Sequence, residues 1–320
     1  MVQNLPSIAI VIPVYNEEHV LPELLRRLAE VCNRETGFNW TITLVNDGSR
    51  DRSEELILEQ SRADGRFRLV SLSRNFGHQA ALSAGLAEAG ACDAVVTMDA
   101  DLQDPPELIP DLVARWRAGA EIVLAVRRSR RETGMRRVGF DIFHSLFNRL
   151  SDFRIPPNTG TFGLLGRNAL VAYNGLSERH RFFPGLRAWV GFETAEIEYD
   201  RLERAAGKPS QTLQRLVRYA FDAIFSFSRL PLRLLTYCGM FVSGCGFALG
   251  LFFVFKRLLG IETASTGFTT LVTLTLFLGG IQLIGIGVLG EYLGRVYDEV
   301  KQRPLYVVNR SKIGIPSVRK

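Results

Sequence analysis

Two aspartates separated by one residue, Asp99 and Asp101, are the side chains in this sequence best suited to chemistry, and Gln103 follows two positions later. They come directly after an apolar run, residues 94–98, which is typical of a buried strand. Carboxylate oxygens are the ligands that hard divalent cations prefer, and Mg²⁺ is usually shared with substrate phosphates. The spacing therefore predicts that Asp99, Asp101 and Gln103 hold a divalent cation together with a phosphorylated ligand.

Two neighbouring polar residues are predicted to have structural roles instead. Asp104 precedes Pro105, and Glu107 lies three residues beyond Asp104, which is the pattern of a capping box at the start of a helix. We therefore expect Asp104 to cap a helix. His78 has no nucleophile at a matching spacing, and we expect it to be structural as well.

A run of arginines begins after the apolar stretch 121–126. Its members are Arg127, Arg128, Arg130, Arg131, Arg136 and Arg137. The arginine fork donates two hydrogen bonds to one phosphate, so such a run suits an anionic ligand. A solvated basic face is the alternative, and we prefer it for Arg130 and Arg131. Arg127 is closest to the predicted strand and is the first candidate for a phosphate contact, with Arg136 or Arg137 next.

The elements that must position these residues are short apolar strands alternating with helical patterns. The predicted strands are residues 8–14, 41–45, 67–72, 94–98 and 121–126, and the first helix is predicted over 20–31. This succession indicates an α/β domain with a Rossmann-like, mainly parallel sheet. Ligands bind beyond the carboxyl ends of such strands. Because Tyr15, Asp47, Asp99 and Arg127 all follow strands, we expect one shared crevice.

Charge and hydropathy are distributed unevenly along the 320 residues. The net charge of +6 suits an anionic partner, which is a nucleic acid, an anionic membrane or a phosphorylated substrate. The mean hydropathy is nevertheless slightly positive, at +0.08. Two uncharged runs, 234–255 and 267–290, account for it, and each is long enough to cross a bilayer as a helix. The sequence therefore predicts two membrane-spanning helices that form a hairpin.

The segment before the first run mixes arginines with large apolar residues, as interfacial amphipathic helices do. An ordinary surface helix is the alternative interpretation. Basic residues are more numerous at the outer flanks of the hairpin than at its short link, so both termini are predicted to be cytoplasmic. The predicted parts are a catalytic-type α/β domain at 1–210, interfacial helices at 211–233, the hairpin at 234–294 and a cytoplasmic tail at 295–320.

Several motifs together carry a resemblance to a known family. They are Ile12-Pro13-Val14-Tyr15-Asn16-Glu17, Val45-Asn46-Asp47-Gly48-Ser49, Arg74-Asn75-Phe76-Gly77, Asp99-Ala100-Asp101-Leu102-Gln103-Asp104 and Gly290-Glu291-Tyr292-Leu293-Gly294-Arg295. The chain resembles family 2 glycosyltransferases of the GT-A fold, and most closely the polyprenyl-phosphate glycosyltransferases such as dolichol-phosphate mannose synthase and the bactoprenol glucosyltransferases. The resemblance covers nearly the whole chain.

The resemblance implies a role for each site residue. Pro13, Tyr15, Glu17 and Asp47 would hold the base and ribose of a nucleotide sugar, and Arg204 and Lys208 would close over its phosphates. Asp99, Asp101 and Gln103 would hold the diphosphate with Mg²⁺ or Mn²⁺. Arg127, with Arg136 or Arg137, would hold the phosphate of the lipid. Asp99, Asp101 and Arg127 are thus the expected catalytic residues.

The implied activity is an inverting transfer from a nucleotide sugar, UDP-glucose or a related donor, to undecaprenyl or dolichyl phosphate. It would take place at the cytoplasmic face of a bacterial inner membrane. A lipid monophosphate is largely a dianion at pH 7, so it needs little help from a general base. Direct attack would convert an α-linked donor into a β-linked product. The expected partners are the donor, the acceptor and the bilayer, without nucleic acid. Self-association and a downstream flippase stay open.

Two features keep alternatives in view. Many bacterial relatives read Gly-Asp-Phe-Arg-Leu where this chain has Thr161 and Gly163 in place of the acidic and basic members, which leaves donor choice open. A processive polysaccharide synthase is one alternative, but its Gln-x-x-Arg-Trp motif is absent because Leu112 precedes Arg115-Trp116. The other is a non-catalytic membrane assembly protein that keeps the fold, which the intact Asp99, Asp101 and Gln103 set argues against.

Overall fold

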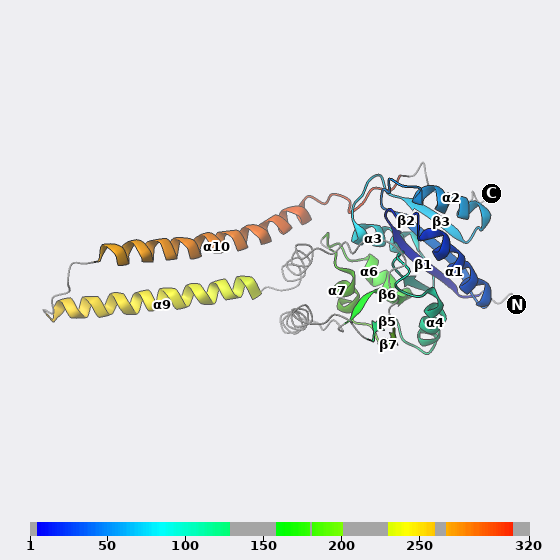
Figure 1. Cartoon of the computed structure of the whole chain (residues 1–320). Coiled ribbons are helices and arrows are strands. Elements are labelled where there is room, and N and C mark those ends of the chain that lie inside the picture. The colour runs from blue at the N-terminus through cyan, green and yellow to red at the C-terminus, as the bar shows by residue number, and fades with distance from the viewer. Residues whose placement is uncertain (1–4, 129–157, 180, 201–229, 260–266, 310–320) are drawn as a thin grey trace. The chain divides into compact units, whose positions relative to one another are not determined.

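The computed structural model describes residues 5–128, 158–179, 181–200, 230–259 and 267–309 (Figure 1). The chain divides into two compact units. The first comprises residues 1–148, 153–212 and 303–320, and it contains the sheet. The second comprises residues 149–152 and 213–302, and it contains two long helices. Arg136, Arg137, Arg204, Lys208 and the predicted interfacial helices at 211–229 lie outside the described residues.

A mixed seven-stranded sheet forms the centre of the first unit, in the order β3-β2-β1-β4-β6-β5-β7. The strands are β1 (Ser7–Val14), β2 (Asn39–Asn46), β3 (Phe67–Ser71), β4 (Ala94–Thr97), β5 (Ile122–Arg127), β6 (Thr159–Gly166) and β7 (Thr194–Tyr199). Four of the six pairings are parallel, and β6 runs antiparallel between β4 and β5. The predicted α/β fold with a mainly parallel sheet is thus confirmed among the described strands.

Helices cover both faces of this sheet. They are α1 (Leu21–Arg34), α2 (Ser53–Ala63), α3 (His78–Glu88), the 3₁₀ helix η1 (Pro106–Leu108), α4 (Ile109–Arg117), α6 (Arg167–Asn174) and α7 (Phe183–Trp189). Helices α1 and α4 pack on the face that carries the larger apolar cluster. Helix α3 packs on the other face, and α6 contacts both α3 and α7.

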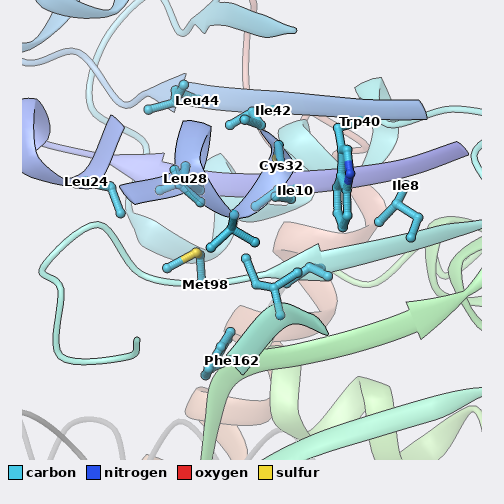
Figure 2. Packing of buried hydrophobic residues seen from close by; sticks show 14 of the residues in the cluster. Ile8, Ile10, Leu24, Leu28, Cys32, Trp40, Ile42, Leu44, Met98 and Phe162 are labelled. Carbon is cyan, nitrogen blue, oxygen red and sulfur yellow. The ribbon is translucent and has the colours of Figure 1, made fainter. Parts of the chain in front are cut away.

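The larger core cluster lies between α1 and the sheet (Figure 2). Alternate residues of β1, Ile8 and Ile10 among them, point to this face because successive side chains of a strand face opposite ways. Leu24 and Leu28 meet them from α1, since residues four apart share one side of a helix. Burying each such side chain contributes about 1.5–3 kcal/mol. This packing fixes the strand ends at which the polar residues gather.

All five predicted strands are confirmed, whereas β6 and β7 were not predicted. The sequence of β6, TGTFGLLG, holds three glycines, which have low strand propensity and hide the apolar pattern. The β7 sequence, TAEIEY, alternates glutamate with half-buried side chains because it is the exposed edge of the sheet. Neither segment has the continuous apolar run that marks a strand buried on both faces.

The second unit contains helices α9 (Leu230–Leu258) and α10 (Phe268–Val300), drawn in yellow and orange in Figure 1. Within the part of the chain that the structure describes, one segment is long and apolar enough to cross a membrane, namely Phe277–Val300. Leu234–Leu249 in α9 is apolar but shorter. One C-terminal helix thus has the length and apolar character that a span requires, in a segment that lies closer to the C-terminus than the predicted run 267–290. The two membrane spans stay a prediction, as do the predicted domain boundaries.

Candidate functional site

The candidate site lies where the strands of the first unit reach their carboxyl ends. Tyr15 follows β1, Asp47 follows β2, and Arg127 is the last residue of β5. Asp99 comes shortly after β4, which ends at Thr97. Strands β1, β2 and β4 are parallel neighbours, so the residues that follow them share one edge of the sheet. The carboxyl ends of β1, β2 and β4 thus lie side by side, whereas the single crevice predicted for all four residues stays a prediction.

Hydrogen bonds join the loop after β1 to the loop after β2. The Asn16 N–H donates to Ser49 Oγ at 3.0 Å, and the Arg50 N–H donates to Asn16 Oδ1 at 2.8 Å. The Glu17 N–H donates to Ser53 Oγ at 2.9 Å. Pro13 is buried within β1, whereas 43% of the Tyr15 surface is exposed. Of the residues predicted to hold a nucleotide base, Tyr15 therefore presents its ring to a ligand most openly.

Asp47 holds the loop that follows β3. Its side chain is only 3% exposed, and its two carboxylate oxygens accept the N–H groups of Phe76 at 2.7 Å and Gly77 at 2.9 Å. Burial raises the pKa of Asp47, while these two hydrogen bonds act in the opposite direction. Gly48 adopts a φ of +69°, and a Cβ there would lie 2.6 Å from the Arg74 carbonyl carbon. The Asn46-Asp47-Gly48 turn thus holds residues 74–77 in place, by hydrogen bonds to Asp47 and by close packing against Gly48.

His78, which was expected to be structural, contacts Asp99. Asp99 is the first aspartate of the loop at residues 99–104, which follows β4 and is called the acidic loop below. The Nε2 of His78 lies 2.9 Å from Asp99 Oδ1. Desolvation lowers the pKa of His78, but the hydrogen bond to Asp99 and the negative charges of Asp99, Asp47 and Asp101 together outweigh it, so the net shift is upward. The ring is well placed to orient the Asp99 carboxylate. One feature of the sequence could have indicated this role of His78. The residue comes directly after the Arg-Asn-Phe-Gly motif, at the end of the loop that follows β3.

The acidic loop is held in an unusual conformation. Asp101 is 7% exposed, and its Oδ1 accepts the N–H of Gln103 at 3.1 Å. Leu102 between them has a φ of +56°, which is costly for a bulky residue. Its side chain is buried in the core, at 4% exposure, and this packing holds the turn. Asp101 is thus joined to the main chain of Gln103, and the predicted cation-binding role of these side chains stays a prediction.

These carboxylates suit a cation that is shared with a substrate. Among the described residues, no group of three or more His, Cys, Asp or Glu side chains surrounds a single point. Mg²⁺ typically takes one or two carboxylates and completes its coordination with substrate phosphates and water. Asp99 and Asp101 supply that number of hard oxygen ligands. The donor set therefore fits a divalent cation that arrives with a diphosphate.

The expectation that Asp104 caps a helix is wrong. The helix after it, η1, begins at Pro106 without a side-chain cap. Asp104 is fully buried and accepts a hydrogen bond from the Tyr199 hydroxyl. Its Oδ1 also lies 3.9 Å from Arg127 Nη2, and Arg127 Nε donates to the Tyr199 hydroxyl at 3.2 Å. The capping pattern misled because the carboxylate turns inward to meet a buried guanidinium.

This buried contact sets the state of Arg127. Its side chain is 16% exposed. Burial disfavours the charged form, yet the neighbouring Asp104 and Tyr199 raise the pKa of Arg127 overall. The guanidinium therefore stays charged at the carboxyl end of β5. It is the one predicted phosphate-binding arginine that lies within the described residues.

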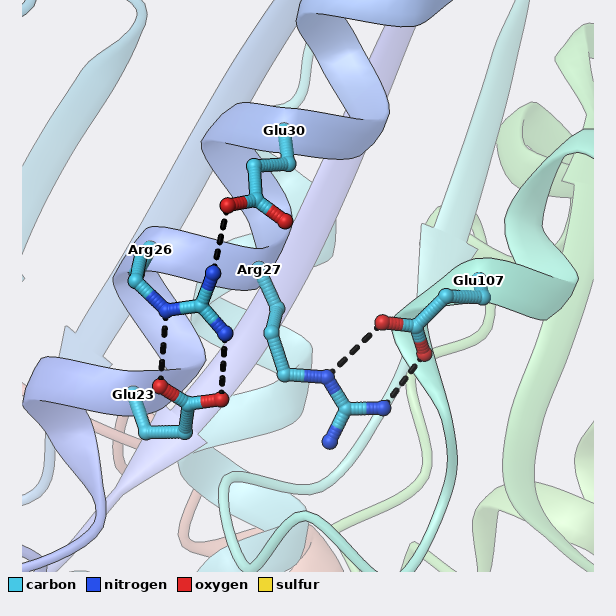
Figure 3. A network of polar contacts seen from close by, with 5 residues as sticks. All are labelled: Glu23, Arg26, Arg27, Glu30 and Glu107. Atoms are coloured by element: carbon cyan, nitrogen blue, oxygen red, sulfur yellow. Dashed lines mark hydrogen bonds and ion pairs between the residues drawn. The ribbon is translucent and has the colours of Figure 1, made fainter.

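A second ion pair holds the far end of the acidic loop. Glu107 of η1 accepts two hydrogen bonds from Arg27 of α1, the Nε bond at 2.8 Å (Figure 3). The neighbouring Arg26 instead pairs with Glu23 and Glu30 on its own helix. The hydrogen bond from Arg27 lowers the pKa of Glu107. Glu107, expected to complete the capping box, thus ties the loop to α1.

The two departures at Thr161 and Gly163 lie on β6. The Thr161 carbonyl accepts a hydrogen bond from Thr97 Oγ1 at 2.6 Å. A Cβ at Gly163 would lie 2.5 Å from the Val123 carbonyl oxygen and 3.0 Å from Arg187 Nη1. The space that a side chain at position 163 would need is therefore taken by the β5 backbone and by a buried arginine from α7.

Comparisons with known proteins were made for the whole chain. Residues 9–173 match the model of the family described as glycosyl transferase family 2. The SfII prophage-derived bactoprenol glucosyl transferase of Shigella flexneri is 41% identical over 97% of this chain and 100% of its own length. An uncharacterized glycosyltransferase of Bacillus subtilis, YkcC, is 43% identical over 95% of this chain and 93% of its own.

Among solved structures, glucosyl-3-phosphoglycerate synthase from Mycobacterium tuberculosis is similar at 21% identity and a TM-score of 0.47. The likeness covers 73% of this chain and 80% of that chain, which was solved with Mn²⁺, UDP and glucosyl-3-phosphoglycerate. Because the sequence identity and the TM-score are this low, the groups bound to that enzyme do not identify ligand positions in this chain.

Proposed function

The chain belongs to glycosyl transferase family 2, and from that premise we propose that it transfers glucose from a nucleotide sugar to bactoprenol phosphate. The observation that carries the proposal is the 41% identity, over 97% of this chain and 100% of the relative, to the bactoprenol glucosyl transferase of Shigella flexneri. The two long apolar helices support it, since such an acceptor resides in a membrane.

The reaction that we propose is a single displacement. An oxygen of the lipid phosphate forms a bond to the anomeric carbon of glucose, and the bond from that carbon to the diphosphate oxygen breaks. The electron pair leaves with the nucleoside diphosphate, and the configuration at the anomeric carbon inverts. The lipid phosphate is largely dianionic at neutral pH, so no proton has to be removed from it. Positioning and charge stabilisation are then the main catalytic demands.

The acidic loop is the proposed site of the donor diphosphate. Asp99, Asp101 and Gln103 would hold it together with Mg²⁺ or Mn²⁺, and the cation would neutralise charge on the leaving group. His78 keeps the Asp99 carboxylate in place at 2.9 Å. UDP is the proposed nucleotide, with Pro13, Tyr15, Glu17 and Asp47 around its base and ribose. Tyr15 offers the exposed ring, while Asp47 acts mainly through the loop at 74–77.

The acceptor phosphate is proposed to bind near Arg127. This guanidinium stays charged at the end of β5, beside Asp104 and Tyr199. A cation there offsets the repulsion between two anionic substrates. Arg136 or Arg137 would assist it, and Arg204 and Lys208 would close over the donor. We propose the cytoplasmic face of the bacterial inner membrane as the location, with both termini on that side.

The test supplies the purified full-length protein with bactoprenol phosphate, Mg²⁺ or Mn²⁺, and labelled UDP-glucose. We expect one labelled lipid product, whose formation stops when the cation is chelated. Asp101→Asn should lower kcat by about 10²-fold or more, as loss of a charge-stabilising group does in other enzymes. Asp111→Asn, on an exposed position of α4, is the matched control and should retain wild-type activity.

Other outcomes would favour the alternatives. A ladder of products bearing several sugars would identify a processive synthase. Failure to transfer glucose or any other sugar from a panel of nucleotide sugars would favour a non-catalytic assembly protein. Full activity of Asp101→Asn would contradict the proposed cation site, but it would not contradict the proposal that the protein is a transferase.

A further inference from the structure

The chain beyond α10 returns to the edge of the sheet. Helix α10 ends at Val300, and residues 303–309 belong to the first unit. Strand β3 is the outermost strand on its side of the sheet. Directly after β3, Leu72 pairs antiparallel with Val308. The Ser73 N–H donates to the Val307 carbonyl at 2.8 Å, and the Asn309 N–H donates to the Ser71 carbonyl at 2.8 Å. Residues 305–309 are called the C-terminal strap below.

Side chains of the strap alternate as they do in a strand. Tyr306 and Val308 pack against a buried cluster, whereas Val307 points outward and is 47% exposed. The members of that cluster are Val45, Val70, Leu72, Ala81 and Ala84. Two residues before the strap begins, the Arg303 carbonyl accepts a hydrogen bond from Arg179. The strap is thus held by backbone pairing and by burial of every second side chain.

The same buried cluster also contacts a residue of the loop at 74–77, which lies at the proposed donor site. Phe76 packs against it together with Tyr306 and Val308. The Phe76 N–H donates to Asp47 at 2.7 Å, and His78, two residues later, contacts Asp99 at 2.9 Å. Residues 74–77 therefore lie between two fixed ends. One end is the bridge of Leu72 and Ser73 to the strap, and the other is the start of α3.

We propose that the C-terminal strap positions the donor-site loop, residues 73–77, with Tyr306 and Val308 as its positioning residues. By clamping Leu72 and Ser73 and by supporting Phe76, the strap keeps the Phe76 and Gly77 N–H groups on Asp47 and keeps His78 against Asp99. The chain that leaves α10 thereby orders the loop at which the nucleotide sugar binds. The identity of that donor rests on the proposed function, whereas the ordering of the loop does not.

The test compares two neighbouring substitutions in the full-length protein. Val308→Asp places a charge in the apolar cluster, and Val307→Asp places the same charge on the exposed side of the strap. We expect Val308→Asp to raise the KM for UDP-glucose about tenfold, since ordering one or two released residues costs about this much. The KM for bactoprenol phosphate should stay unchanged. Val307→Asp and the conservative Val308→Ile should behave as wild type.

Amide hydrogen exchange of the full-length protein supplies a readout that does not require turnover. In Val308→Asp, the Ser73, Phe76 and Gly77 amides should exchange faster, while amides of β1 and β4 keep wild-type protection. If wild-type protein transferred no sugar, the proposed function would fail, yet the exchange pattern would still test the strap. Three results would overturn the inference: equal effects at 307 and 308, an unchanged donor KM, or faster exchange throughout the sheet.

Discussion

Arg187 is a charged residue that is almost completely buried. It is 2% exposed, and Nη1 has no hydrogen-bond partner among the residues that the structure describes. Nη2 donates to the Gly160 carbonyl at 3.2 Å, and the guanidinium lies 5.1 Å from the centre of the Phe183 ring. Burial lowers the pKa of Arg187 to about 10. Because pH 7 lies well below that value, the folded protein carries the buried charge and its full desolvation penalty.

We predict that Arg187→Met stabilises the protein. A flexible apolar side chain would fill the same space without the desolvation penalty, although the bond to Gly160 would be lost. Replacing buried charge by apolar groups of similar volume is often stabilising, and we expect a gain of about 1–2 kcal/mol. Thermal unfolding at pH 7 checks this, with Arg128→Met, whose side chain is 61% exposed, as the control. An equal or lower Tm for Arg187→Met would contradict the prediction.

Residue types and spacing predicted the centre of the candidate site but not the contacts that hold its residues in place. Asp99 and Asp101 were predicted because a strand followed by two spaced carboxylates has few other uses. The pairing of His78 with Asp99 was missed because it joins residues on different elements. The role of Asp104 was misjudged for the same reason, since its partner Tyr199 lies on β7, which was not predicted. Local patterns do not encode such partners.

At the scale of elements, the acidic loop is held between α1 and the sheet. The Arg27–Glu107 pair connects α1 to η1, and the hydrogen bond from Arg27 lowers the pKa of Glu107 below its ordinary value of 4.5. A carboxyl with a lowered folded-state pKa stabilises the fold above its unfolded pKa. That contribution disappears as the pH falls through the folded value. The pair therefore makes the attachment of η1 sensitive to acid.

Glu107→Gln should reveal this sensitivity. The variant should unfold at a lower temperature than wild type at pH 7, and the difference should shrink as the pH falls through the folded-state pKa of Glu107, because the wild-type carboxyl then becomes protonated. The measurement is Tm against pH between 7 and 3. Glu30→Gln, which removes an exposed partner of Arg26 within α1, should stay near wild type at each pH. A Tm difference that is independent of pH would show that the charge on Glu107 is not responsible.

Strands with a continuous apolar run were predictable, including the edge strand β3, whereas β6 and β7, which lack such a run, were not. The apolar runs of β1 and β2 indicated strands, because each run is too short for a membrane-spanning helix and is followed by turn residues. Strand β6 pairs antiparallel with two neighbours, and a register shift follows Leu124 of β5. Its glycines are required because neighbouring atoms, such as the Val123 carbonyl oxygen beside Gly163, leave no space for a Cβ. Such a contact between strands is not visible in the sequence. Mixed topology therefore had to come from the structure.

At the scale of the whole molecule, the second unit contributes a segment with the length and composition of a membrane span. Phe277–Val300 is the described segment that is apolar enough to cross a bilayer, and its large side chains are exposed in the isolated chain. Exposed apolar surface of this extent is stable only when lipid or another apolar surface covers it. A charged side chain at the centre of such a helix costs about 2.5–3.5 kcal/mol on insertion. The segment should therefore be intolerant of a central charge.

Ile286→Arg tests this directly, because Ile286 is 65% exposed and lies well inside the segment. We expect a smaller share of the variant to remain in the membrane after alkaline carbonate extraction than of wild type. Glu196→Arg, on the exposed edge strand β7, adds an arginine to the catalytic unit and should leave that share unchanged. With α9 still apolar over Leu234–Leu249, partial retention of Ile286→Arg would indicate that the shorter helix also inserts. Complete retention would show that α10 is not the span.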